Sequence, residues 1–207
     1  MIRVVGIGPG QFTLLTKQCI DVLMDANNLI GTVRQLDVMP NLIKTETKQI
    51  YVYEGRLNQL GAIIDQLLSK RDTPTVLASG DPSFYGIGEW IKANYPEETL
   101  MLIPGISSAQ YMFNRICIPM HDVYMTSAHG REPDFELWSK MKRICVLTDK
   151  KWTPYTIANE IVTLNDNPIV YIGEKLSYPD ETITICRANS VPEKDYEMNV
   201  VVIEYER

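Results

Sequence analysis

An apolar run that ends at a glycine and turns toward a helix is the feature that most constrains this sequence. Residues 75–78 read Thr-Val-Leu-Ala, which is typical of a short buried strand, and Ser79-Gly80-Asp81-Pro82 follow at once. Asp81 is a favourable N-cap residue and proline suits the first helical position, so the pattern predicts a helix from Pro82. Open α/β sheets bind ligands where a strand end meets a helix N-terminus. The stretch therefore predicts either a ligand-binding turn or a tight connection without a ligand.

A second turn of the same kind favours the ligand-binding interpretation. Residues 100–108 read Leu-Met-Leu-Ile-Pro-Gly-Ile-Ser-Ser, again an apolar run followed by a glycine and small polar residues. Ser107 and Gln110 have the spacing of a capping box, which predicts a helix start. Around the first turn, Gly80, Gly86 and Gly88 carry no side chain, and we expect this to let the backbone approach a bound molecule closely.

The order of the expected elements predicts an α/β fold with two small domains. Strands are expected at 2–7, 29–31, 49–53, 75–78 and 100–103, with helices at 16–26, 56–69 and 82–95 and a further helix from Ser107. Such alternation indicates a mostly parallel sheet. The segment 118–122 interrupts it, so we place the boundary there, with an N-terminal domain of residues 1–119 and a C-terminal domain of residues 120–207.

The second domain is predicted to contain a mixed sheet. Strands are expected at 123–127, 144–147, 168–172, 182–187 and 199–205, and helices at 134–142 and 154–164. The last two strands leave no room for a helix between them, which favours an antiparallel finish.

Composition and charge exclude several classes of protein. The net charge of −6 argues against nucleic acid as a partner, since such proteins carry a basic surface. No apolar run approaches the roughly 18 residues of a membrane span, and no targeting segment precedes the first strand, so a cytoplasmic protein without a membrane partner is expected. The four cysteines form no Cys-x-x-Cys pair, which predicts reduced thiols and neither a disulfide framework nor a metal site.

The residues offer little apparatus for hydrolysis. There are two histidines, His121 and His129, and neither a Gly-x-Ser-x-Gly motif nor histidine spacing for a metal is present. The first turn, Gly6-Ile7-Gly8-Pro9-Gly10, lacks the third glycine of a dinucleotide fingerprint and is followed by no Gly-Lys-Ser/Thr. Turns that hold a ligand, with little acid or base chemistry, favour group transfer in which the bound cofactor supplies the reactive group.

Three motifs together resemble those of the tetrapyrrole methylases. They are Gly6-Ile7-Gly8-Pro9-Gly10, Ser79-Gly80-Asp81-Pro82 and Pro104-Gly105-Ile106-Ser107-Ser108. The resemblance covers essentially the whole chain. It implies two small α/β domains in the tetrapyrrole methylase fold, with S-adenosylmethionine, the methyl donor, held in the cleft between them.

Further residues resemble the branch of the family that methylates C(5) of cobalt-precorrin-7 in cobalamin biosynthesis. These are Ser127-Ala128-His129-Gly130-Arg131, Leu147-Thr148-Asp149, and Gly173-Glu174-Lys175-Leu176 with Pro179-Asp180-Glu181. The resemblance implies a small-molecule tetrapyrrole substrate, a homodimer, and a separate protein for methylation at C(15) and decarboxylation. Any cobalt is expected to arrive within the substrate.

The resemblance also assigns site residues. The cofactor-binding residues are Pro9, Ser79, Gly80, Asp81, Phe84, Ser107 and Ser108, with Leu147 and Gly173 from the second domain. Substrate binding is assigned to His129 and Arg131, the arginine because a precorrin is rich in carboxylates. Each glycine and proline can equally serve turn geometry, Asp81 can cap a helix, and His129 and Arg131 can be ordinary surface residues.

The expected reaction is direct displacement of the methyl group by an electron-rich ring carbon. Its rate depends mainly on alignment, and no residue is assigned as a general base. The alternatives are a tetrapyrrole methylase that acts at another ring position, a non-catalytic S-adenosylmethionine-binding module, and a nucleotide-dependent oxidoreductase. Binding of nicotinamide would indicate the oxidoreductase, and cofactor binding without methyl transfer would indicate the module.

Overall fold

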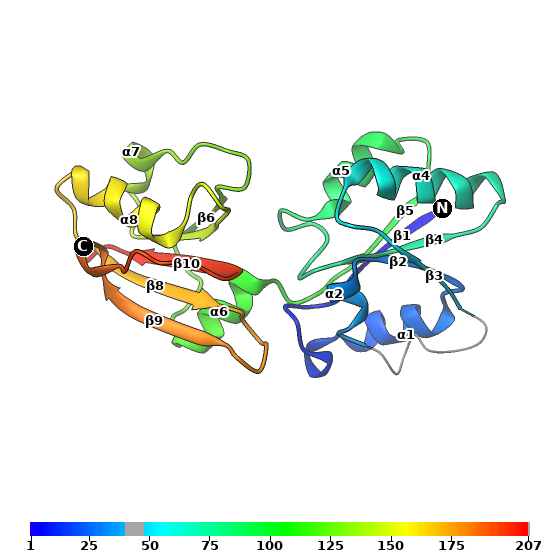
Figure 1. The fold of residues 1–207 in the computed structure, drawn as a ribbon, viewed down its shortest axis with the longest axis horizontal. Coiled ribbons are helices and arrows are strands. Elements are labelled where there is room, and N and C mark those ends of the chain that lie inside the picture. Colours follow the sequence, from blue (N-terminus) through cyan, green and yellow to red (C-terminus); the bar gives the residue numbers. More distant parts are fainter. Residues whose placement is uncertain (40–47, 207) are drawn as a thin grey trace. The chain divides into compact units, whose positions relative to one another are not determined.

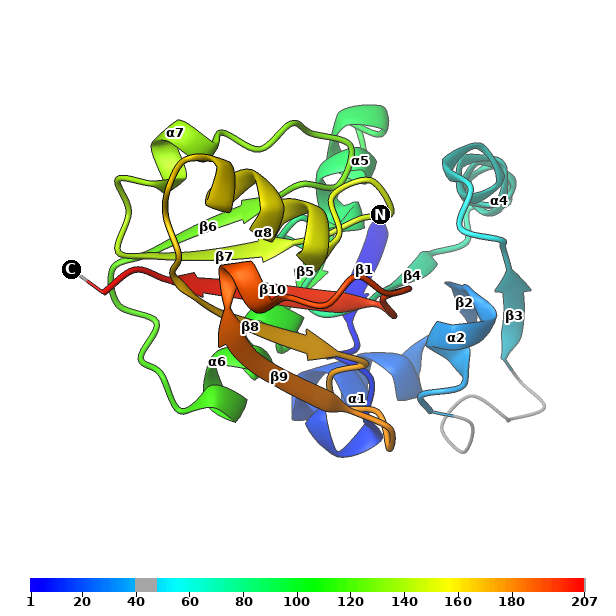
Figure 2. The ribbon, with the colours of Figure 1, turned by 60° about the vertical axis from the view of Figure 1, so that its left-hand side comes forward.

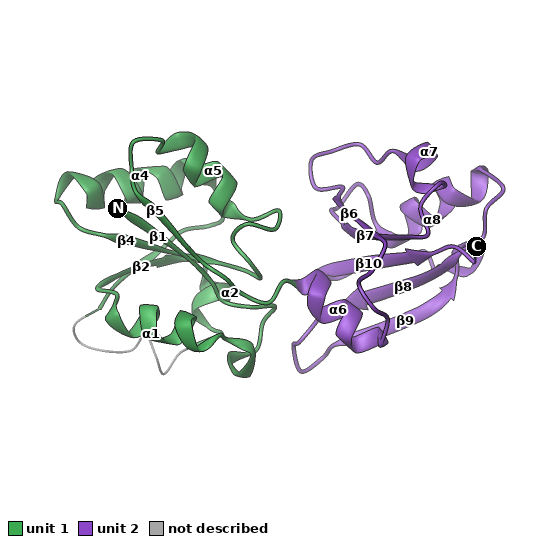
Figure 3. Ribbon diagram, turned by 180° about the vertical axis from the view of Figure 1, so that it is seen from behind, with its two compact units in different colours: residues 1–107 green, residues 108–207 purple. Residues whose placement is uncertain are grey.

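The chain forms two compact units, each with its own five-stranded sheet. The structure, a computed structural model, describes residues 1–39 and 48–206. Unit 1 comprises Met1–Ser107 and unit 2 comprises Ser108–Arg207 (Figure 3). This division differs from the boundary at residues 119/120 in the sequence analysis, because helix α6 (Ser108–Ile116) packs against strands of the second sheet.

Unit 1 contains a fully parallel sheet. Its strands are β1 (Ile2–Gly6), β2 (Asn28–Gly31), β3 (Gln49–Val52), β4 (Pro74–Ala78) and β5 (Leu100–Ile103), in the order β3-β2-β4-β1-β5. The central strands β1 and β4 are almost wholly buried, as their continuous apolar sequences predict. The predicted parallel sheet is therefore confirmed.

Helices cover both faces of this sheet. They are α1 (Lys17–Asp25), α2 (Val33–Leu36), α4 (Leu57–Ser69) and α5 (Ile87–Asn94), with a 3₁₀ turn, η1, at Phe12–Leu14. One face packs under α4 and α5 and the other under α1 and α2 (Figure 1). The apolar stripe predicted for 56–69 is confirmed, since Leu60, Ile64 and Leu67 are fully buried. Thr16 caps α1 by accepting a hydrogen bond from the Cys19 amide at 3.1 Å.

Unit 2 contains the predicted mixed sheet. Its strands are β6 (Val123–Ser127), β7 (Arg143–Leu147), β8 (Ile169–Glu174), β9 (Thr182–Arg187) and β10 (Asn199–Glu204), in the order β6-β7-β10-β8-β9. The β6–β7 pair is parallel and every other pair is antiparallel, which confirms the mixed sheet. The last two strands, β9 and β10, do not pair with each other: each is antiparallel to β8, which lies between them, so the two run in the same direction.

The helices of unit 2 also lie on both faces. Figure 2 shows α7 (Phe135–Trp138) and α8 (Pro154–Thr163) on one side of the sheet and α6 on the other. A 3₁₀ turn, η2 (Ala188–Ser190), packs against α8. The helix predicted at 134–142 is much shorter. Asp134 is its N-cap, and it ends at Trp138, whose ring packs on Phe135 with centroids 5.0 Å apart.

Candidate functional site

The two motif turns and the first glycine turn meet at one edge of the unit 1 sheet. Gly6 pairs with Ala78 and Val5 with Ile103, so β1, β4 and β5 end side by side. Beyond the strands, Gly8 and Gly80 form an antiparallel bridge with N···O distances of 3.2 and 2.7 Å. Both have φ near +70°, a conformation that glycine adopts without strain.

The backbones of three glycines pack so closely here that no side chain fits between them. A Cβ atom on Gly105 would lie 2.2 Å from the Gly80 carbonyl oxygen and 2.8 Å from the Gly6 carbonyl carbon. A Cβ on Gly6 would lie 2.7 Å from the Gly105 nitrogen. The three motifs picked out in the sequence thus form one structural unit, in which Gly6 and Gly105 must be glycine because of each other and of the Gly80 carbonyl group.

Asp81 ties the second and third turns together. Its Oδ2 accepts a hydrogen bond from the Gly105 amide at 3.1 Å, and its Oδ1 accepts from the Ser83 amide at 2.8 Å. Burial raises the pKa of Asp81, but hydrogen bonds from Ser83, Gly105 and Phe84 lower it more, so the pKa lies below its ordinary value. The carboxylate therefore stays charged and clamps the two loops.

The prediction that Asp81 caps a helix beginning at Pro82 is wrong. Helix α5 begins at Ile87, and Gly86 is its N-cap. The Asp81 carboxylate instead closes a turn on Ser83 and reaches Gly105, so residues 81–86 form a loop. This contact across 24 residues cannot be seen in the local sequence.

Gly86 and Gly88 are required by the packing of this loop. A Cβ on Gly86 would lie 2.7 Å from the carbonyl oxygens of Asp81 and Pro82, and one on Gly88 would lie 2.6 Å from that of Pro82. The Gly88 amide donates to the Pro82 oxygen at 3.1 Å. These contacts within the loop are by themselves enough to require glycine at both positions, and the expected close approach of a bound molecule stays a prediction.

Helix α2, which the sequence analysis did not predict, holds Ser79. Thr32 and Gln35 form a capping box, and the buried Gln35 amide donates to the Leu77 oxygen at 3.2 Å and to Ser79 Oγ at 3.3 Å. Arg34 also donates to Ser79 Oγ, at 3.3 Å. The pattern Thr-x-x-Gln at 32–35 was the available signal for this helix.

The remaining unit 1 residues assigned to the cofactor lie around the same edge. Pro9 is buried beside the Gly8–Gly80 bridge, whereas Ser79 is exposed. Phe84 is half-buried, and its ring packs edge to face on Tyr85 with centroids 5.0 Å apart. Ser107 ends unit 1 and Ser108 begins α6 in unit 2.

The residues assigned in unit 2 also gather at one sheet edge. Leu147 and Gly173 pair with Val200 from opposite sides, so the ends of β7 and β8 flank β10. The Ala128 amide donates to the Leu147 oxygen at 2.8 Å, which places the segment after β6 next to them. Three chain segments of unit 2 therefore end together, as three do in unit 1.

Asp149 organises the loop that carries His129 and Arg131, both of which are exposed. Its Oδ2 accepts from the Gly130 amide at 3.2 Å, and its Oδ1 accepts from the Lys151 and Trp152 amides at 2.9 and 2.7 Å. The hydrogen bond from Trp152 is the main cause of a lowered pKa at Asp149. The sequence analysis assigned no role to this carboxylate.

The comparisons with known proteins identify the family. Residues 1–192 match the family model described as Tetrapyrrole (Corrin/Porphyrin) Methylases. The chain belongs to this family, and the expectation drawn from the three motifs is confirmed.

Individual proteins of known name are also similar to this chain. The chain is 37% identical, over the full length of both proteins, to the cobalt-precorrin-7 C(5)-methyltransferase of Salmonella typhimurium. It shares its fold with the precorrin-6Y methylase structure from Archaeoglobus fulgidus, with a TM-score of 0.73 and 20% identity, covering 100% of this chain and 99% of that one. It is also 27% identical to the precorrin-6Y C(5,15)-methyltransferase of a Sinorhizobium species, over 64% of this chain but only 31% of that protein.

Within residues 1–39 and 48–206, no helix is both long and apolar enough to cross a membrane. The same part of the chain contains no group of three or more histidine, cysteine or acidic side chains that could hold a metal ion.

Proposed function

We propose that this protein is an S-adenosylmethionine-dependent C-methyltransferase of cobalamin biosynthesis that methylates C(5) of cobalt-precorrin-7. The observation that carries the proposal is the interlocked turn structure of Gly6, Gly80 and Gly105, built from the three motifs at one edge of a parallel sheet. Such an edge is where open α/β sheets bind ligands. The full-length similarity to a cobalt-precorrin-7 C(5)-methyltransferase supports the choice of ring position.

The residues present suit a methyl donor that is held chiefly by backbone groups. Ser79 is an exposed side chain beside Gly80, and the Asp81 carboxylate is held next to it by the Gly105 amide. We assign the donor to Pro9, Ser79, Gly80, Asp81, Phe84, Ser107 and Ser108, with Leu147 and Gly173 from unit 2. The donor supplies an already activated methyl group, so the protein has to hold and align, and no general base is assigned.

The substrate side is assigned to His129 and Arg131. Both follow β6 at the edge where β7 and β8 also end, and Asp149 holds their loop. An arginine forms paired hydrogen bonds with a carboxylate, and precorrins carry many carboxylates. The Arg131→Ala variant is expected to bind the precorrin more weakly and to keep its affinity for S-adenosylhomocysteine. Equal loss of both affinities would contradict the assignment.

The proposal extends to partners and location. We assign methylation at C(15) and decarboxylation to a separate protein, since the Sinorhizobium relative named for both positions is matched over only 31% of its length. A homodimer and a cytoplasmic location complete the proposal. Light scattering after size-exclusion chromatography tests the dimer, which a single species of about 24 kDa would contradict.

The first test is calorimetric titration of the purified protein with S-adenosylhomocysteine, with NADH as the control ligand. We expect one-to-one binding of S-adenosylhomocysteine and no heat from NADH. Binding of NADH alone would overturn the cofactor class and favour an oxidoreductase.

The second test is incubation with S-adenosylmethionine and cobalt-precorrin-7, read by mass spectrometry and NMR. The expected product carries one added methyl group at C(5). A methyl group at another carbon would indicate a related methylase of different regiochemistry, and cofactor binding without transfer would indicate a non-catalytic module.

A further inference from the structure

The loop between β8 and β9 has a conformation that its own residues do not favour. Lys175 and Ser177 have φ of +48° and +69°, in the left-handed region that residues with a Cβ rarely adopt. Ser177 is 1% exposed, and its hydroxyl finds no hydrogen-bond partner among the described residues. A strained backbone and an unpaired buried hydroxyl persist only when surrounding groups impose them.

Glu181 supplies the group that imposes this conformation. Its Oε2 accepts a hydrogen bond from the Ser177 amide at 2.6 Å, and its Oε1 accepts one from Arg115 Nε, also at 2.6 Å. Tyr111 hydrogen-bonds the same carboxylate. Burial raises the pKa of Glu181, but these three partners lower it more, so the carboxylate is charged at neutral pH.

The partners of Glu181 lie on the helix that begins at a residue assigned to the cofactor. Tyr111 and Arg115 belong to α6, which starts at Ser108. Between them, Met112 packs on Gly173: a Cβ added to Gly173 would lie 2.5 Å from Met112 Sδ and 2.7 Å from Leu176 Cδ2. The loop therefore folds over Gly173 and is fastened to α6 by Glu181.

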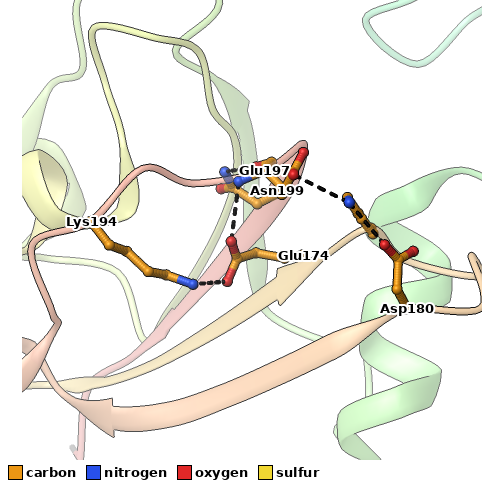
Figure 4. Close-up of polar contacts among 6 residues, drawn as sticks. Glu174, Asp180, Lys194, Glu197 and Asn199 are labelled. Carbon is orange, nitrogen blue, oxygen red and sulfur yellow. Dashed lines mark hydrogen bonds and ion pairs between the residues drawn. The ribbon is translucent and has the colours of Figure 1, made fainter.

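A second set of contacts anchors the start of the same loop. Figure 4 shows the buried Glu174 carboxylate between Lys194 Nζ, at 2.6 Å, and the Glu197 amide, at 3.1 Å. Asp180 is exposed and forms an ion pair with Lys175 at 2.8 Å. Exposed pairs contribute little, so Asp180 is a matched control for Glu181 in the same loop.

We propose that Glu181 is a positioning residue for the cofactor site, locking the loop 175–181 onto α6 and so fixing Gly173 and Ser108 in one arrangement. Its partner in this role is Arg115. This inference rests on the proposed function, because Gly173 and Ser108 are assigned to the methyl donor there. Glu181 acts through the loop and does not itself contact the donor.

The test compares Glu181→Gln with Asp180→Asn by calorimetric titration with S-adenosylhomocysteine. Both changes replace an acid by its amide. We expect Glu181→Gln to raise Kd about tenfold, the effect of losing one charge-assisted contact, and Asp180→Asn to leave Kd unchanged. A wild-type Kd in folded Glu181→Gln, or an equal loss in Asp180→Asn, would overturn the proposal.

Variants of Arg115 keep the test decisive if Glu181→Gln fails to fold. The Arg115 side chain is half exposed, so its replacement is tolerated more easily. Arg115→Met is expected to raise Kd about tenfold relative to the wild type, and Arg115→Lys to keep most of the affinity. Where Glu181→Gln folds, the double variant with Arg115→Met is expected to bind no more weakly than either single variant. Additive losses, or no rescue by lysine, would contradict a shared positioning role.

The same titrations separate this inference from the proposed function. Binding by the wild type with no effect of either substitution overturns the positioning role alone. No binding of S-adenosylhomocysteine by the wild type overturns the proposed function itself.

Discussion

Replacing Gly105 by alanine tests whether the three glycine turns form one structural unit. The added Cβ would lie 2.2 Å from the Gly80 carbonyl oxygen, more than 1 Å inside the roughly 3.5 Å at which such atoms are in favourable contact. The next neighbours, at 2.8 and 2.9 Å, are the carbonyl carbon and oxygen of Gly6. All three are backbone atoms, so no side chain can rotate away and the strand ends themselves must move.

The expected cost follows from two terms. Overpacking a well-packed region costs about 1–3 kcal/mol. Moving the Gly80 oxygen also weakens its hydrogen bond from the Gly8 amide, for a further loss of about 1 kcal/mol. The sum of roughly 2–4 kcal/mol corresponds to a fall in Tm of about 4–16 °C for a chain of this length.

The assay is thermal unfolding together with titration of S-adenosylhomocysteine, and Gly61→Ala is the control. Gly61 lies inside α4, and its added Cβ would make ordinary contacts at 3.6 Å with Trp90 and Tyr95, so the substitution is expected to stabilise by about 0.5–1 kcal/mol. Gly105→Ala is expected to lose affinity at least tenfold as well as stability. A wild-type Tm and a wild-type Kd in Gly105→Ala would refute the reasoning.

Three further predictions concern the carboxylates and the buried amide. Asp81→Asn is expected to lower the free energy of unfolding by about 1–3 kcal/mol at pH 7. Because the pKa of Asp81 in the folded protein lies below 3.8, the charged carboxylate contributes its full stabilisation above that pH. This stabilisation is lost as the pH falls through the folded pKa. Melting curves from pH 7 down to 3 check this, and a difference from wild type that does not shrink in acid would contradict it. Gln35→Leu is expected to cost about 1–3 kcal/mol in urea unfolding, since it leaves the buried Leu77 oxygen without its donor, and an unchanged midpoint would count against the role of α2. Asp149→Ala is expected to speed hydrogen exchange at the Gly130 amide about tenfold or more, whereas unchanged protection would show that another group holds the loop.

The strands and the topology were predictable because burial leaves a strong mark on the sequence. A strand covered on both faces needs an unbroken apolar run, and β4 and β10 have one. The short spacing between β9 and β10 leaves no room for a crossover helix, but it does not give their relative direction: both strands are antiparallel to β8, which lies between them, and so they run the same way.

Boundaries that depend on contacts between distant residues were not predictable. An amphipathic pattern says that α6 has an apolar face, but not which sheet covers it, so the unit boundary was placed after α6 and not before it. The predicted helix start at Pro82 was wrong for a similar reason, because the Asp81 carboxylate accepts a hydrogen bond from the Gly105 amide and does not cap α5.

In the candidate site, too, the sequence shows which residues are present but not which of them are in contact. Glycine at 6, 80 and 105 is visible in the sequence as three turn motifs, yet only the folded chain shows that a Cβ at Gly6 or Gly105 would clash with the backbone of the other two glycines. Gly86 and Gly88 cannot be told apart from them in the sequence, but in the structure a Cβ at either position would clash with the Pro82 carbonyl oxygen instead. A glycine-rich turn therefore indicates a close approach of the backbone to another group. Only the folded structure shows whether that group is a neighbouring loop or the same loop. Acidic residues show the same difficulty. The carboxylates of Asp81, Asp149 and Glu181 each accept hydrogen bonds from backbone amides of a loop. The sequence alone therefore does not distinguish a carboxylate that holds a loop from one that acts in catalysis.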